Sequence, residues 1–242
     1  MKKIVLVWLC TILLLLCSCS AQNATNDTST ESITLNPVGT YTDVSFADTN
    51  SLYIDFMLQA AGKESAKKTI VIAGTDTGYS YQDSVFSGQF TNNGDGDFTA
   101  KKEQVITNDP LLSKTAELEL AQSPYTFYKV YDNYLIKKVP LSNVSITGEL
   151  PSEGKKTTCF IYINHITFST YTLSFSSDGS CEMTTIFNSD ICSVSGTYSV
   201  KGGIISLALT KGVFYGETLS GNIEMVLYTE DNTLYDTVYR KK

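Results

Sequence analysis

The chain has 242 residues and a formal net charge of −7, from 18 Lys and Arg residues against 25 Asp and Glu residues. Because nucleic acids and anionic lipid surfaces select basic proteins, this balance excludes both as expected partners. Every basic residue except Arg240 is Lys, which argues against bidentate recognition of phosphate groups.

The first segment predicts an export signal over residues 1–18. Lys2 and Lys3 precede an apolar run, Ile4–Leu16, that only Thr11 interrupts. A membrane-spanning helix needs roughly 20 apolar residues, so this run is too short and has the flanks of a signal peptide instead.

The run ends in Leu16-Cys17-Ser18-Cys19, which resembles the lipobox of bacterial lipoproteins. This resemblance implies cleavage before Cys19, diacylglycerol on its thiol and acylation, with palmitate expected, of its new amino group. Two alternatives are a plain signal peptide with a coincidental Cys and lipidation of Cys17, which lacks a small residue before it. Because cleavage removes Lys2 and Lys3 and no acidic residue, it changes the net charge from −7 to −9.

Residues 19–36 are predicted to form a lipidated, flexible tether. The stretch Ser20–Ser32 is polar and nearly free of apolar side chains, so it cannot bury enough surface to offset its chain entropy. Because two or three acyl chains hold a protein firmly on a membrane, we expect a membrane-anchored protein of the cell envelope. It would face outside the cytoplasm, on an outer membrane or at the cell surface.

The remaining chain predicts an all-β, antiparallel fold, because apolar and polar residues alternate along most of it. Examples of apolar residues at every second position are Ile70 and Ile72, Leu118 and Leu120, Tyr171 to Phe175, Ile205 to Leu209, and Ile223 to Leu227. Leu52–Ala61 fits a short helix or a strand. Asp109-Pro110 predicts one helical turn, with Asp as the cap and Pro in the first position.

Two β domains, 37–138 and 139–242, are predicted because the second half resembles the first. Tyr131-Asp132 is followed after four residues by Lys137-Lys138, and Tyr235-Asp236 by Lys241-Lys242. Likewise, Ser87-Gly88-Gln89-Phe90 matches Ser195-Gly196-Thr197-Tyr198. A duplication explains both matches, and a chance origin is the alternative.

The segment Ser195–Leu207, with a Gly turn before alternating apolar residues, resembles the lipocalin-like domains of bacterial lipoproteins. The resemblance implies two tandem lipocalin-like β-barrels. A β-sandwich or one larger barrel satisfies the same alternation.

Three cysteines besides Cys19 survive cleavage: Cys159, Cys181 and Cys192. Since exported proteins meet oxidising conditions, we predict a disulfide between Cys181 and Cys192, with Cys159 as the alternative partner of either. No Cys-x-x-Cys spacing and no second His accompany His165, so neither a metal site nor a cofactor is predicted.

The absence of a nucleophile motif around His165 favours a non-catalytic binding protein over an enzyme. Its expected ligand is a small molecule, a glycan or a protein, and a carboxylate-based hydrolase is the alternative. The predicted contact surface is the tyrosine cluster of Tyr125, Tyr128, Tyr131 and Tyr134, because Tyr combines an apolar face with a polar tip.

Overall fold

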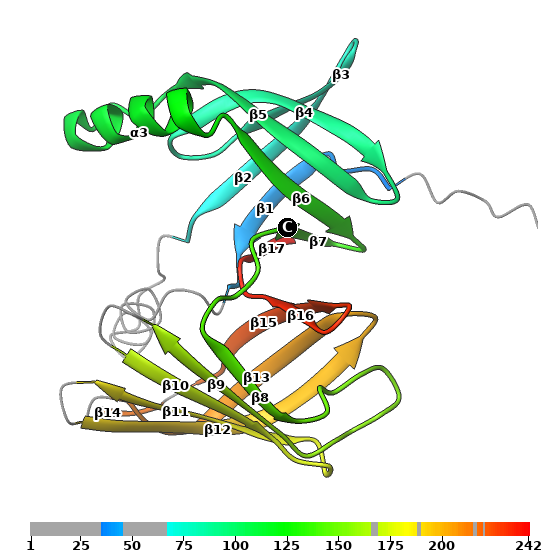
Figure 1. Cartoon of the computed structure of the whole chain (residues 1–242), viewed down its shortest axis with the longest axis vertical. Helices are drawn as coiled ribbons and strands as arrows, with labels where there is room; N and C mark the ends of the chain where they lie inside the picture. The colour runs from blue at the N-terminus through cyan, green and yellow to red at the C-terminus, as the bar shows by residue number, and fades with distance from the viewer. Residues whose placement is uncertain (1–34, 46–66, 166–168, 188–189, 215–216, 220) are drawn as a thin grey trace, which may run out of the picture. The chain divides into compact units, whose positions relative to one another are not determined.

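The computed structural model describes residues 35–45, 67–165, 169–187, 190–214, 217–219 and 221–242 (Figure 1). These residues form an antiparallel all-β fold with a closed eight-stranded barrel and a second, strongly curled sheet. The predicted all-β fold class is therefore confirmed, and the alternative of one larger barrel is wrong.

The closed barrel has the strand order β1-β17-β7-β6-β5-β4-β3-β2. Its strands are β1 (Gly39–Asp43), β2 (Thr69–Thr75), β3 (Gly78–Gln82), β4 (Phe86–Gly94), β5 (Asp97–Val105), β6 (Tyr125–Tyr131), β7 (Tyr134–Lys137) and β17 (Val238–Lys241). Its core contains a group of aromatic side chains, in which the rings of Phe90 and Phe98 are stacked with centroids 4.8 Å apart.

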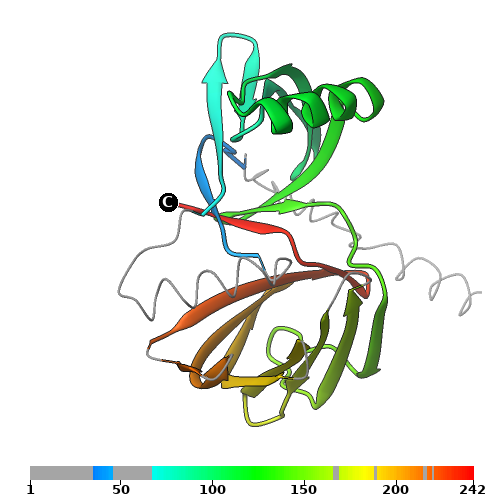
Figure 2. The same ribbon diagram turned by 90° about the vertical axis from the view of Figure 1, so that its left-hand side faces the viewer.

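The last strand of the chain, β17, closes this first barrel. It pairs with β1, where Tyr41 faces Lys241, and with β7, where Leu135 faces Tyr239. Figures 1 and 2 show this red strand beside the blue β1, at the opposite end of the sequence. The strand order revises the predicted second domain, 139–242, because its last strand belongs to the first barrel.

The second sheet has the order β16-β15-β13-β12-β11-β10-β9-β8, with β14 beside β13. Its strands are β8 (Val144–Gly148), β9 (Cys159–His165), β10 (Ser169–Phe175), β11 (Ser180–Phe187), β12 (Asp190–Lys201), β13 (Ile204–Phe214), β14 (Glu217–Thr218), β15 (Ile223–Glu230) and β16 (Thr233–Tyr235). Ahead of β8, Pro140 forms an isolated bridge with Tyr235, and the Leu141 N–H donates to the Leu234 carbonyl oxygen.

The barrel and the second sheet have the same local structure, a β-bulge, at the matched Ser-Gly pairs. A β-bulge lies at Ser87-Gly88, where β4 meets β5, and another at Ser195-Gly196, where β12 meets β13. A Cβ atom on Gly88 would lie 1.9 Å from the Lys101 carbonyl oxygen, and one on Gly196 would lie 1.8 Å from that of Ala208. Both positions therefore require Gly, because the neighbouring strand leaves no room for a side chain.

The matched segments that contain Tyr131-Asp132 and Tyr235-Asp236 do not occupy equivalent positions in the two sheets. Tyr131-Asp132 lies in the β6–β7 hairpin, whereas Tyr235 ends β16 and Asp236 leads into β17. The hairpin that corresponds to β6–β7 is β15–β16, in which Asp231 and Asn232 have positive φ angles, as Asp132 does.

A helix, α3 (Pro110–Gln122), connects β5 to β6. Asp109 caps it by accepting hydrogen bonds from the N–H groups of Leu111 and Leu112, and Pro110 takes the first turn, where its missing N–H costs nothing. The predicted single turn is thus too short, and the predicted alternation at Leu118 and Leu120 belongs to a helix and not to a strand. Leu52–Ala61 lies outside the described residues.

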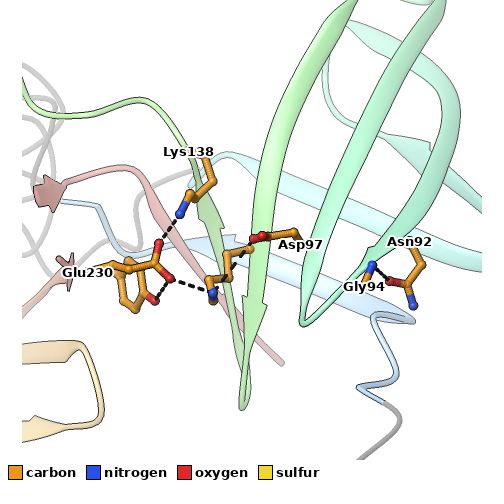
Figure 3. Close-up of polar contacts among 7 residues, drawn as sticks. Asn92, Gly94, Asp97, Lys138 and Glu230 are labelled. Atoms are coloured by element: carbon orange, nitrogen blue, oxygen red, sulfur yellow. Dashed lines mark hydrogen bonds and ion pairs between the residues drawn. The ribbon is translucent and has the colours of Figure 1, made fainter. Parts of the chain in front are cut away.

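A third apolar cluster joins side chains of the first barrel to side chains of the second sheet. It contains Val44, Ile136 and Val238 from the former and Ile204, Val226, Tyr228 and Tyr235 from the latter. Beside it, the Glu230 carboxylate accepts hydrogen bonds from Lys129, at 2.7 Å, and from Lys138 (Figure 3). Partial burial alone would raise the pKa of Glu230, but the two ammonium groups hold it at about 2.

Candidate functional site

The predicted lipidation site, Cys19, lies outside the described residues, as does the predicted signal 1–18. Of the predicted tether 19–36, the structure describes Leu35 and Asn36, and the Leu35 side chain packs against the core of the first barrel. Within the described ranges, no helix has the length and apolar character that crossing a membrane requires.

The predicted tyrosine surface does not form. Tyr128 is 3% exposed and its ring lies 5.9 Å from that of Phe90, in the core of the first barrel. Tyr131 and Tyr134 are half-buried against the third apolar cluster. Since the faces of a strand alternate, residues three apart point to opposite sides, so Tyr125 and Tyr128 cannot share a surface. Tyr125 is exposed, together with Phe127 on the same face of β6.

The predicted disulfide between Cys181 and Cys192 is wrong, because Cys181 is a free, buried thiol. In the register of β11 and β12, Cys181 faces Gly196 and Cys192 faces Thr185. This offset of four residues amounts to about 13 Å along a strand, beyond the roughly 7 Å that a disulfide allows.

Cys159 is also a free, buried thiol, and it does not pair with Cys181. The two cysteines face Phe175 of β10 from its two neighbouring strands, which places their Cα atoms roughly 10 Å apart. Burial raises the pKa of both thiols, that of Cys181 to about 11. Both thiols are therefore protonated at neutral pH and are poor nucleophiles.

The strongest candidate site is the outward face of β9, β10, β11, β12 and β13, which we call the β9–β13 outer surface. On these strands the buried side chains, such as Ile161, Leu173 and Met183, point into the core. The alternate positions point outward. Among them, Phe160 and Tyr162 are 49% and 45% exposed, so that two aromatic side chains lie side by side on the surface of β9.

The strand register places polar residues beside this aromatic pair. One row across the sheet joins Phe160, Ser174, Glu182, Ser195 and Lys211, each facing the next on the adjacent strand. The next row joins Tyr162, Thr172, Thr184 and Ser193. On the other side of the pair, β8 places Thr147 opposite Phe160 and Ser145 opposite Tyr162.

An open depression of about 340 Å³ lies next to the aromatic pair on this surface. It is lined by Ser174, Ser176, Ser180, Cys181, Glu182, Ser195, Gly196, Thr197, Thr210 and Lys211. The bulge at Ser195-Gly196 shapes it, because Thr210 is the extra residue that faces no partner in the β12–β13 register and Gly196 adds no side chain. Because most of the lining residues are Ser or Thr, hydroxyl groups dominate the lining.

The two charged residues of the depression are not paired with each other. The Glu182 carboxylate accepts a hydrogen bond from the Ser193 hydroxyl, and neither Glu182 nor Lys211 takes part in an ion pair with another described residue. Ser195 lies between them in the row, so their Cα atoms are two strand spacings, roughly 10 Å, apart. Both charges remain available to a ligand.

The lining offers hydrogen-bonding groups and a single carboxylate to a ligand. Glycoside hydrolysis needs two carboxyl groups about 5 to 9.5 Å apart, and Glu182 is the one carboxylate among the lining residues. Cys181 is among the lining residues, but its side chain is buried in the core of the second sheet, and burial raises the pKa of its thiol to about 11. Among the residues that the structure describes, no group of three His, Cys, Asp or Glu side chains is placed to hold a metal ion.

Comparisons with protein families, with curated proteins and with solved structures find no match to this chain.

Proposed function

We propose that this protein is a binding lipoprotein of the cell envelope that is anchored through Cys19 and captures its ligand on the β9–β13 outer surface. The observation that carries the proposal is the exposed pair Phe160 and Tyr162 beside an open depression lined by hydroxyl groups. Binding sites combine aromatic side chains with a few convergent polar groups in this manner.

The position of the surface supports the proposal. The outward side chains Ile204, Val226 and Tyr228, on β13 and β15, are covered by the first barrel in the third apolar cluster. Among the described residues, no apolar cluster covers the outward side chains of β9 to β12, and Phe160 and Tyr162 are about half exposed. One part of the second sheet therefore stabilises the fold, and the other part is free to meet a ligand.

Site-specific photo-crosslinking in cells tests this function without assuming the ligand class. A benzophenone side chain replaces Ser195 in the depression, or, as the matched control, Ser87 at the equivalent bulge of the first barrel. We expect an envelope component to be crosslinked at position 195 and not at position 87. Equal crosslinking at both positions, or none at either, would refute a specific role of this surface.

The anchor is tested separately by Cys19→Ala. We expect the wild-type protein to carry acyl chains by mass spectrometry and to partition into detergent, and the variant to lose both properties. A variant that still carries acyl mass would show that another residue, such as Cys17, is the lipidation site.

A further inference from the structure

We infer that the ligand of the β9–β13 outer surface is a neutral oligosaccharide. This inference rests on the proposed function and adds the chemical class of the ligand. A sugar ring presents an apolar face of C–H groups and a rim of hydroxyl groups. Its binding surface must therefore offer an exposed aromatic face with hydrogen-bonding groups around it.

The aromatic pair supplies the exposed aromatic face that a sugar ring requires. Phe160 and Tyr162 are two positions apart on β9, so their side chains leave the same face of the sheet about 6.6 Å apart. Hydroxyl groups flank the pair on both sides, from Ser145 and Thr147 on β8 and from Thr172 and Ser174 on β10. A sugar ring stacked on either aromatic side chain lies within reach of these hydroxyl groups.

The depression supplies the hydrogen-bonding groups that the sugar hydroxyl groups require, and it does so over a longer distance. The row that starts at Phe160 continues through Ser174, Glu182 and Ser195 to Lys211, which crosses four strand spacings, or roughly 19 Å. Glu182 accepts hydrogen bonds and Lys211 donates them, while the Ser and Thr hydroxyl groups do both. A short oligosaccharide that runs across the strands matches this succession of one aromatic contact and several polar ones.

The charges favour a neutral ligand. The depression holds one carboxylate and one ammonium group, so it has no excess charge to attract an ion. The whole chain has a net charge of −7, which repels acidic polysaccharides at long range. A protein partner fits less well, because the centre of a protein interface is depleted of charged groups and this one contains Glu182 and Lys211.

The test is isothermal titration calorimetry on the lipid-free mature chain with cello-, chito- and malto-oligosaccharides as probes. We expect at least one of them to bind, and Phe160→Ser with Tyr162→Ser to weaken that binding at least about tenfold. The matched control is Tyr125→Ser with Phe127→Ser, which removes an equally spaced, exposed aromatic pair from β6 of the first barrel. This control should bind as the wild type does.

Glu182→Gln is an independent variant that keeps the shape of the side chain and removes its charge. It should weaken binding of the same probe, and thermal melts establish that each variant is folded. If no probe binds, or if the β6 control loses binding as much as the β9 variant does, the oligosaccharide inference is overturned. In that case, selective crosslinking at position 195 would still support a binding protein with a ligand of another class, whereas its absence would end both proposals.

Discussion

Deletion of the last five residues, Val238–Lys242, should open the first barrel, although these residues follow the whole second sheet in the sequence. The deletion removes β17, which pairs with β1 on one side and with β7 on the other. The side chains of Val238 and Tyr239 are buried, and Val238 also belongs to the third apolar cluster.

The expected loss is large compared with the stability of a typical domain. Burial of a large apolar side chain contributes about 1.5–3 kcal/mol, so Val238 and Tyr239 together contribute about 3–6 kcal/mol. The backbone hydrogen bonds to β1 and β7 add about 0.5–1.5 kcal/mol each. This sum is comparable with the total free energy of unfolding of a native domain, roughly 5–15 kcal/mol.

Hydrogen exchange followed by mass spectrometry tests this prediction, with deletion of Lys242 alone as the control. Peptides from β1 and β7 should lose protection in the five-residue deletion, whereas β10 and β11, which β17 does not contact, should keep it. The melting temperature should fall by more than about 10 °C. Wild-type protection in β1 and β7 would show that the barrel does not depend on the C-terminal strand.

Three further variants test particular contacts. Gly196→Ala should destabilise the protein by about 1–3 kcal/mol in thermal melts, because the added Cβ atom would lie 1.8 Å from the Ala208 carbonyl oxygen. The control variant Gly74→Ala should have little effect, since the nearest atom to its added Cβ would be 3.9 Å away. Tyr128→Ser truncates a side chain of the barrel core and should lower the free energy of unfolding, measured by urea denaturation, by about 3–5 kcal/mol. If Tyr125→Ser were equally destabilised, Tyr125 would not lie on the exposed face of β6. Because the pKa of Glu230 is lowered to about 2 from its usual 4.5, the stabilisation from its lysine partners is complete above pH 4.5 and is lost as the pH falls toward 2. Glu230→Gln should flatten this part of the stability profile in chemical denaturation at stepped pH, and an unchanged profile would show that the ion pairs contribute nothing.

Alternation of apolar and polar residues was sufficient to predict strands such as β10, which buries Tyr171, Leu173 and Phe175 on one face. It was insufficient for β9, where Phe160, Ile161, Tyr162 and Ile163 are all apolar. The sequence there does not distinguish the buried face from the exposed one. The register resolves this, since Ile161 and Ile163 are buried and the two aromatic residues point outward. The candidate site was therefore missed in the sequence.

Long-range pairing explains the other differences. The sequence order indicated two consecutive domains, but strand pairing joins β17 to β1, which lie about 200 positions apart in the register. A disulfide between Cys181 and Cys192 requires that the two residues face each other, and the β11–β12 register places Gly196 opposite Cys181 instead. The Ser-Gly match, by contrast, was informative, because both glycines lie at bulges that exclude a side chain.

The most direct test of a ligand-binding β9–β13 outer surface is NMR chemical-shift mapping of the lipid-free mature chain with the oligosaccharide that calorimetry identifies. We expect shifts of amide resonances in β9 to β12, around Phe160, Tyr162 and Ser195, and none around the equivalent bulge at Ser87. Shifts confined to the first barrel, or spread evenly over both sheets, would contradict this expectation.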